Sequence, residues 1–355
     1  MKIIHTSDLH LESAMSKFSP IKAKERAQEL FLTFERMADE GAREGVSVII
    51  IAGDMFDSEK YSKRSRDRAL GIIKRHPDID FLYLIGNHES GSFVKDGLDL
   101  PHNLKVFGKE WTYFNYGDVT IAGKSEAVGN VFTGLELEES RKNIVVLHGA
   151  VKDSAGEGEG ISLPLARGRN IDYLALGHYH TYTEYSLDKR GVAVYSGTPE
   201  GRGFDETGEK GYMVIDTTPT LKYSLRPFAR RRLHTIPLDL SGVVRTAEIA
   251  ERAERALRNI PSTDIVRLEL VGRYFPTLWK DVDSLVGAYE NRFYYFEVKD
   301  SSRIAINPED YRNDKSLKGE FIRTVASDDS LDEETKEKII ACGINALMGE
   351  ELFDR

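Results

Sequence analysis

The sequence predicts an α/β fold for the first two-thirds of the chain and a smaller α+β part after it. Three observations indicate this: short apolar runs bounded by Gly, Asp and His, helical patterns between the first of these runs, and a change of pattern around residues 219–234. The chain has 355 residues, 40% of them hydrophobic, so it can bury a sizeable core. This length exceeds what one core usually organises, and two or three domains are expected.

The apolar runs of the first part are typical of buried strands, because each is a few residues long and rich in Ile, Val, Leu or Tyr. They lie at residues 2–5, 46–52, 81–85, 119–122, 144–148, 173–176 and 192–195. Residues 21–44 place Leu30, Phe34 and Met37 at helical spacing, and a second helix is expected over 62–75. Alternation of strands and helices favours parallel pairing. The later strands follow one another without long helices, so that region should be richer in β-structure.

The part after residue 234 shows a different pattern of elements. Two helices are expected among three strands, which indicates a small α+β domain; the strands lie at 233–238, 264–270 and 293–298, and the helices at 246–258 and 279–290. The last forty residues hold two short helical patterns with apolar positions at Leu317, Phe321, Val325, Ile340, Ile344 and Leu347.

Composition excludes several classes of protein. Lys and Arg number 49 and Asp and Glu number 58, a net charge of −9, so binding to nucleic acid would need a local basic patch or metal ions. The single cysteine, Cys342, excludes a disulfide framework and a thiolate zinc cluster. No apolar run approaches the roughly 20 residues of a membrane span, and the first ten residues do not read as a signal peptide. A cytoplasmic protein without a membrane partner is expected.

Polar residues able to bind metals directly follow five of the predicted strands. The carboxyl ends of parallel strands meet at one edge of a sheet, so these side chains should converge there. The residues concerned are Asp8 and His10, then Asp54, Asn87 and His148, and finally His178 and His180. A single His at a strand end is more often an ordinary polar residue than a ligand. Five such sites in order outweigh that interpretation.

The number and type of these donors indicate a two-metal site. Two carboxylates, one amide and four imidazoles are too many for one ion and suit two, with one carboxylate bridging. Mixed oxygen and nitrogen donors without sulfur favour Mn, Fe or Zn over Ca. Two ions about 3.5–4 Å apart can hold a phosphate and lower the pKa of a bridging water. The predicted chemistry is in-line attack of the resulting hydroxide on a phosphoester, without a covalent enzyme intermediate.

The order of these motifs resembles that of the calcineurin-like metallophosphoesterase superfamily. The series is DxH, GDxxD, GNHE, HG and GHxH, and the resemblance spans residues 1 to about 225. Within the superfamily, the bacterial SbcD-type DNA repair exonucleases, which pair with an SbcC-type ATPase, are similar in the segments HTSDLHL, IIAGDMFD, LALGHYH, YSGTPE and FDETGEKG.

The resemblance implies a fold and a domain organisation. The fold would be a metallophosphoesterase β-sandwich flanked by helices (α/β/β/α), with a small α+β capping domain and C-terminal helices. The nuclease domain would span 1–228 and the capping domain 229–305. Residues 306–355 would form a linker and a helical segment that docks on the coiled coil of the ATPase; packing of these helices on their own domain is the alternative.

The resemblance also implies roles for individual residues. One ion would be held by Asp8, His10, Asp54 and His180, and the other by Asp54, Asn87, His148 and His178, with Asp54 bridging. His88 would face the phosphate and protonate the leaving oxygen or stabilise the charge of the transition state. Asp57 would either orient a ligand His or cap the following turn.

This sequence lacks residues by which other branches of the superfamily bind a phosphate monoester. Ser/Thr phosphoprotein phosphatases share GNHE but grip a phosphate dianion with two arginines, and Ser58-Glu59 and Ile85 stand at those places. A purple-acid phosphatase would need a Tyr where Asp57 stands. A diester needs less clamping, and basic residues near the expected rim, Arg64, Arg66 and Arg202, are candidates for substrate binding.

The resemblance therefore implies a manganese-dependent 3′–5′ exonuclease and endonuclease acting on DNA. It would be the nuclease half of an ATPase–nuclease repair complex of double-strand breaks, and a homodimer is left open. Two alternatives also stay open: a phosphodiesterase or phosphatase of the same fold acting on cyclic nucleotides or nucleotides, and a mainly scaffolding subunit that holds the ATPase.

Overall fold

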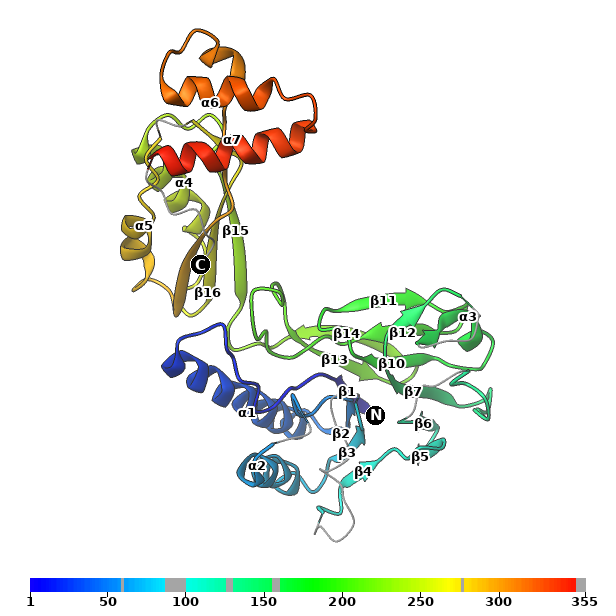
Figure 1. Ribbon diagram of the computed structural model, residues 1–355. Helices are drawn as coiled ribbons and strands as arrows, with labels where there is room; N and C mark the ends of the chain where they lie inside the picture. The colour runs from blue at the N-terminus through cyan, green and yellow to red at the C-terminus, as the bar shows by residue number, and fades with distance from the viewer. Residues whose placement is uncertain (59–60, 87–99, 126–129, 155–159, 276–277, 349–355) are drawn as a thin grey trace. The chain divides into compact units, whose positions relative to one another are not determined.

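The chain divides into two compact units, Met1–Leu233 and His234–Arg355 (Figure 1). The computed structural model describes residues 1–58, 61–86, 100–125, 130–154, 160–275 and 278–348. The domain boundaries expected at residues 228 and 305 stay a prediction.

Two six-stranded sheets form the first unit. The first sheet has the order β14-β13-β1-β2-β3-β4, and its strands are β1 Lys2–Thr6, β2 Val46–Ala52, β3 Asp80–Leu84, β4 Leu104–Val106, β13 Gly211–Asp216 and β14 Lys222–Pro227. In this sheet β1 to β4 are parallel, β13 pairs antiparallel with β1, and β14 pairs antiparallel with β13.

The second sheet also has a parallel centre, and both of its edge strands are antiparallel to their neighbours. Its order is β11-β12-β10-β7-β6-β5, and its strands are β5 Thr112–Tyr116, β6 Val119–Gly123, β7 Lys142–His148, β10 Tyr173–Gly177, β11 Thr183–Ser186 and β12 Val192–Tyr195. The edge strands β5 and β11 run antiparallel to their neighbours. A small pair, β8 Val151–Lys152 and β9 Ile161–Ser162, lies outside the two sheets.

Helices and loops cover the outer faces of the two sheets, and a common core lies between the sheets. Val48 and Ile50 of β2 belong to the same buried cluster as Val146 of β7. On the other face of β2, Ile49 lies against Gly41 of α1 (Pro20–Arg43), which packs beside α2 (Lys63–Lys74) (Figure 1). The second sheet is covered by α3 (Leu163–Ala166) and loop residues. Each fully buried aliphatic side chain contributes about 1.5–3 kcal/mol to folding.

The predicted fold class is confirmed: the first unit is a helix-flanked α/β/β/α sandwich. The strand ends that carry the predicted ligands do not share one sheet edge, however, because β7 and β10 belong to the second sheet. The sequence pattern also missed five strands of the two sheets, β4, β5, β11, β13 and β14, and the short strands outside them. Three of these, β5, β11 and β14, are partly exposed and alternate with polar residues, so they lack the apolar run by which the other strands were found.

The second unit is built on a three-stranded sheet in the order β15-β16-β18. Its elements are β15 Leu233–Asp239, α4 Thr246–Leu257, β16 Ile265–Val271, β17 Arg273–Tyr274, α5 Val282–Tyr289, β18 Tyr295–Asp300, β19 Arg303–Ile304, the 3₁₀ helix η2 Pro308–Tyr311, α6 Leu317–Ala326 and α7 Glu333–Met348. Helix α5 begins three residues later than expected, because Asp281 caps it by accepting from the backbone N–H of Ser284 at 3.0 Å.

Helices α6 and α7 pack on the core of this second unit. Ile322 of α6 and Ile344 of α7 belong to the same buried cluster as Leu268 of β16, and Phe321 is partly buried against it. Leu317, at the start of α6, is exposed. The expected apolar stripe of α6 is therefore divided between the core and the surface.

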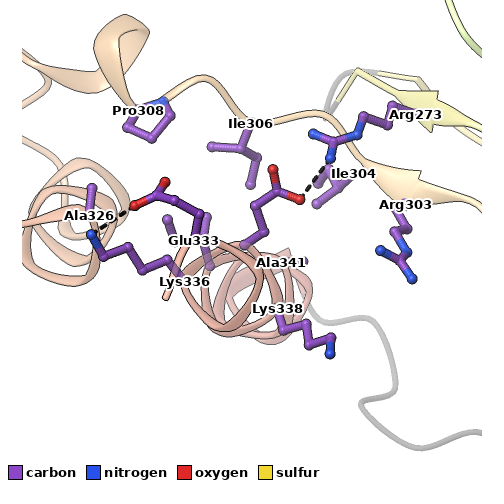
Figure 2. Close-up of a pocket in the computed structure, with 12 residues that line it drawn as sticks. Arg273, Arg303, Ile304, Ile306, Pro308, Ala326, Glu333, Lys336, Lys338 and Ala341 are labelled. Carbon is purple, nitrogen blue, oxygen red and sulfur yellow. Dashed lines mark hydrogen bonds and ion pairs between the residues drawn. The ribbon is translucent and has the colours of Figure 1, made fainter. Parts of the chain in front are cut away.

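A cavity of about 320 Å³ lies where α6 and α7 meet β19 and η2 (Figure 2). Its walls include Ile304, Ile306 and Ala341. The cations beside it are partly paired: Arg273 lies 2.7 Å from Glu337.

Among the helices of the described residues, none has the length and apolar character that crossing a membrane requires.

Candidate metal centre

The loops after β1 and β2 run side by side and bring the first predicted ligands together. The backbone N–H of Asp8 donates to the carbonyl of Gly53 at 3.0 Å, and that of His10 donates to the carbonyl of Asp54 at 3.1 Å. Asp8, His10, Asp54 and His178 all have positive φ, between 44° and 113°. Such strained backbone in non-glycine residues clusters at functional sites, where the surrounding structure enforces it.

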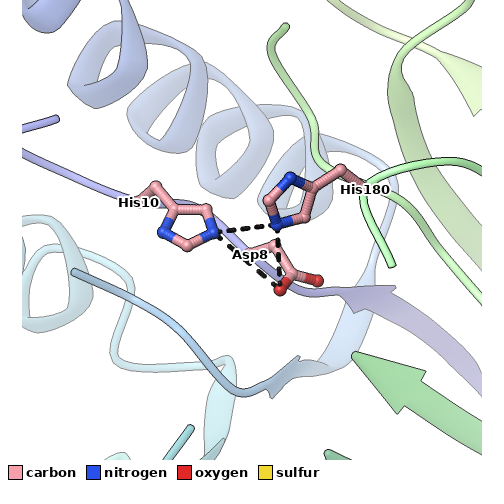
Figure 3. Close-up of side chains that lie close together, drawn as sticks. All are labelled: Asp8, His10 and His180. Atoms are coloured by element: carbon pink, nitrogen blue, oxygen red, sulfur yellow. Dashed lines mark hydrogen bonds and ion pairs between the residues drawn. The ribbon is translucent and has the colours of Figure 1, made fainter. Parts of the chain in front are cut away.

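One group of ligands joins the loop after β1 to the loop after β10. Asp8, His10 and His180 offer donor atoms that all lie within 4.8 Å of one another (Figure 3). The two imidazole Nε2 atoms are 3.1 Å apart, and they lie 4.0 Å (His10) and 3.8 Å (His180) from Oδ1 of Asp8. Asp8 and His10 are buried and His180 is partly exposed, so this group is reached from solvent on the His180 side.

A second group of ligands uses the same carboxylate. Asp8, Asp54 and His148 are all buried, and their donor atoms also lie within 4.8 Å of one another. Nδ1 of His148 donates to the carbonyl of Ala52 at 2.8 Å, and its Nε2 lies 3.4 Å from Oδ2 of Asp54. The geometry thus makes Asp8 common to both groups, whereas the resemblance implies Asp54 as the bridge. The assignment of each ligand to one ion stays a prediction.

The remaining predicted ligands lie differently. The ring of His178 packs edge-on against that of His148, with centroids 5.6 Å apart, and His178 belongs to neither group. Its backbone N–H donates to the Asp8 carboxylate at 3.1 and 3.2 Å. Asn87 and the predicted acid His88 lie outside the described residues, and their roles stay predictions.

The donor atoms of the first group fit a bound cation. Nδ1 of His10 faces Asp57 at 3.1 Å, and Nδ1 of His180 faces Glu206 at 2.7 Å and Nη2 of Arg202 at 3.1 Å. Where a ring donates from Nδ1 to its carboxylate, its Nε2 presents a lone pair. Two lone pairs 3.1 Å apart repel unless one ring is protonated or a cation lies against both. With the Asp8 carboxylate beside them, this is the nitrogen and oxygen donor set that Mn, Fe and Zn prefer.

A proton on His148 offsets part of the negative charge of the second group. Burial opposes protonation of His148, but the Asp54 and Asp8 carboxylates outweigh it and raise the pKa of His148 to about 9. For His178, burial and the neighbouring His148 lower the pKa. Because a metal binds only the deprotonated nitrogen, filling this group would displace the proton of His148.

Two glycines allow the strand ends to approach this closely. A Cβ on Gly177 would lie 1.9 Å from the carbonyl oxygen of Ala52, and one on Gly86 would lie 1.9 Å from Oδ1 of Asp54. Neither distance is possible for a real side chain, so glycine at 177 lets β10 approach β2 of the other sheet, and glycine at 86 lets the end of β3 approach Asp54.

Two carboxylates support the ligand histidines from outside. Asp57 lies against His10, as one of its two predicted roles requires, and the hydrogen bond from His10 lowers the pKa of Asp57 although burial opposes it. Glu206, which contacts His180, was not predicted. No strand directly precedes Glu206, so the search for polar residues at strand ends could not find it. In the sequence, Glu206 is marked only by its place in the segment FDETGEKG, one of those that resemble the SbcD-type exonucleases.

The arginines predicted to bind substrate lie in different environments. Arg64 is exposed on α2, and Arg66 pairs with Asp67 at 3.0 Å. Arg202 is largely buried between Asp57 and Glu206. Other basic residues of the first unit pair internally: Arg226 with Glu40 and Glu44, and Arg230 and Arg231 with Glu29.

This geometry agrees with the family to which the chain is similar in sequence. Residues 1–182, about half of the chain, match the calcineurin-like phosphoesterase family. The chain belongs to this family, and with it to the metal-dependent phosphoesterases, whose fold implies two divalent ions.

The chain is also similar to individual proteins, two of them in sequence and one in structure. Over 257 residues the chain is 27% identical to the DNA double-strand break repair protein Mre11 of Saccharolobus solfataricus, covering 64% of this chain and 65% of that protein. It is 28% identical over 242 residues to the uncharacterised metallophosphoesterase YhaO of Bacillus subtilis, covering 61% of this chain and 58% of that one. The chain thus covers less than two thirds of the length of either relative. A dimetal phosphatase from Danio rerio is similar in structure over 61% of this chain and 92% of its own, with 12% identity and a TM-score of 0.39.

Proposed function

We propose that this chain hydrolyses DNA phosphodiesters with two manganese ions, as the 3′–5′ exonuclease and endonuclease subunit of an ATPase–nuclease complex for double-strand break repair. The observation that carries the proposal is the convergence of Asp8, His10, Asp54, His148 and His180 from two sheets on one point. The relatives named as DNA double-strand break repair proteins support DNA as the substrate.

Different residues of the chain would bind the ions and donate the proton in this reaction. When bound, the two ions would supply an activated water and polarise the phosphate. Asp8, His10 and His180 would hold one ion, and Asp54 and His148 would hold the other, joined by His178 and Asn87 as the resemblance implies. By holding the ions in fixed positions, these residues would orient the substrate before reaction, which would lower the entropic cost of the step. His88 would then donate its proton to the leaving oxygen.

The surroundings of the first ligand group suit a diester better than a monoester. A monoester dianion is usually gripped by an arginine that forms two hydrogen bonds to it. Arg202 lies beside this group, and its guanidinium already donates to Asp57 and Glu206 at 2.5 and 2.7 Å. A phosphodiester carries one charge and is neutralised by the ions alone.

Hydrolysis of four substrates compared side by side tests this function. Linear double-stranded DNA, a cyclic nucleotide, bis-p-nitrophenyl phosphate and p-nitrophenyl phosphate would be incubated with the protein and Mn²⁺. We expect cleavage of DNA and of the generic diester, and loss of both by at least about 100-fold in Asp8→Ala, because Asp8 belongs to both ligand groups.

A matched control is Asp118→Asn, which removes an exposed carboxylate paired with Lys142 at the β5–β6 turn and should retain full activity. Hydrolysis of the cyclic nucleotide or the monoester without DNA cleavage would replace the proposal by the nucleotide phosphodiesterase or phosphatase alternative. If Asp8→Ala still supports repair of double-strand breaks in cells, the chain acts mainly as a scaffold.

A further inference from the structure

An arginine and two carboxylates connect the outer nitrogens of His10 and His180. Nδ1 of His10 lies 3.1 Å from Asp57, and Asp57 lies 2.5 Å from Nη1 of Arg202. Nη2 of Arg202 lies 2.7 Å from Glu206, which lies 2.7 Å from Nδ1 of His180. We call Asp57, Arg202 and Glu206 the outer carboxylate bridge. It ties together two ligands that are 170 residues apart in the chain.

The outer carboxylate bridge is held rigidly by its own backbone and by its neighbours. The backbone N–H of Arg202 donates to the Glu206 carboxylate at 2.7 Å, and the backbone N–H of Glu206 donates to the carbonyl of Gly203 at 2.8 Å. Lys210 donates to the backbone carbonyl of His180 at 2.6 Å. The Glu206 side chain is almost fully buried. His180 is therefore fixed at its ring and at its backbone.

In the second ligand group, the histidine that the structure brings to the carboxylates is His148. The outer nitrogen of His148 donates to a backbone carbonyl, that of Ala52, at 2.8 Å. A carbonyl carries a partial charge, whereas Asp57 and Glu206 are carboxylates. A carboxylate that accepts from the outer nitrogen orients an imidazole and makes it a stronger donor to a metal, and losing such a partner typically costs 10–100-fold in metal affinity.

We propose that the outer carboxylate bridge makes the two metal sites unequal, so that the ion held by Asp8, His10 and His180 binds more tightly than the ion held by Asp54 and His148. Arg202 and Glu206 are then positioning residues. The guanidinium of Arg202 offsets the repulsion between two carboxylates and sets the distance between the two histidines. This inference rests on the two-metal centre of the proposed function and is independent of the substrate.

Titration of the metal-free full-length protein with Mn²⁺, followed by the spin resonance signal of the free ion, tests the inference. The wild type should show a tight and a weak binding step. Glu206→Gln should weaken the tight step by about 10–100-fold and leave the weak step within about twofold. Arg202→Lys should weaken the same step by less, because an ammonium cannot hold both carboxylates in the fork of a guanidinium.

Asp172→Asn is the matched control, because it breaks a partly buried carboxylate–arginine pair, with Arg190 at 2.9 Å, on the N-terminal side of β10. Both binding steps should be unchanged in it. Two equal sites in the wild type, or a Glu206→Gln protein in which both steps or neither weaken, would overturn the inference. If Glu206→Gln does not fold, as its unfolding temperature without metal would show, Arg202→Lys decides in the same way. No nucleic acid enters the measurement, so a wrong substrate leaves the result intact.

Discussion

His5 lies three residues before Asp8 and is completely buried at the interface of the two sheets. Its Nδ1 lies 2.9 Å from the hydroxyl of Tyr173 on β10, so one side chain links the strands that lead to Asp8 and to His178. Burial lowers the pKa of His5 to about 3, against a smaller opposite effect of a backbone hydrogen bond. The imidazole therefore stays neutral in the folded protein at every pH at which the enzyme would work.

This buried imidazole predicts acid lability of the fold. Below pH 6.5 the unfolded chain takes up a proton at His5 and the folded chain does not, so the free energy of unfolding falls by about 1.4 kcal/mol per pH unit. Between pH 7 and pH 5 the wild type should lose about 2 kcal/mol more than His5→Gln, which keeps a hydrogen-bonding side chain without titrating. Urea unfolding at both pH values, with a chelator present, measures this. An equal loss in both proteins would contradict it.

Individual residues also show how far the sequence predicts the site. Asp8, Asp54 and His148 were found because each follows a buried strand, and this position is visible as an apolar run that ends in a polar residue. The contact of Glu206 with His180 and the pairing of Arg202 with Asp57 were not found, because they depend on a loop that returns to the site from a distance in the chain. Periodicity carries no information on such returns.

At the scale of elements, the close approach of β10 to β2 should affect both the stability of the fold and metal binding. β10 reaches β2 at Gly177, where a Cβ would lie 1.9 Å from the carbonyl oxygen of Ala52. Gly177→Ala must push these strands apart, at a cost of about 1–3 kcal/mol or more, and should also weaken metal binding. Gly71→Ala in α2 is the control: it meets only Arg75 at 3.7 Å and should stabilise the helix by about 0.5–1 kcal/mol. Thermal unfolding and metal content measure both, and a Gly177→Ala protein equal to wild type in both would refute this role of the glycine.

The elements themselves were predicted unevenly, for a physical reason. β2 is buried on both faces and reads as an unbroken apolar run, so its bounds were found as the structure has them. β11 and β14 lie at sheet edges with one face in water, and their alternating polar residues resemble those of loops. The parallel strands at the centre of each sheet can thus be predicted from the sequence, and the edge strands cannot.

At the scale of the whole molecule, the packing of the second unit decides how its role can be tested. Ile322, Ile340 and Ile344 of α6 and α7 are part of the core of that unit. Removing residues 315–355 would open this core, and a lost interaction after such a deletion would report unfolding. Substitution of exposed side chains on the same helices avoids this difficulty.

Leu317 on α6 and Leu347 on α7 are 72% and 48% exposed, so charging them should leave the core intact. If the helices dock on the coiled coil of an SbcC-type ATPase, as the resemblance implies, Leu317→Glu with Leu347→Glu should weaken that association by at least about tenfold, because desolvating a carboxylate in an apolar contact is costly. Manganese-dependent hydrolysis of bis-p-nitrophenyl phosphate should not change, because the ligand groups lie in the first unit. Val244→Glu charges another exposed position, 63% accessible, and should bind normally. Co-purification and sedimentation with the ATPase measure the association; an undiminished complex with the doubly charged variant would show that these helices serve only their own core.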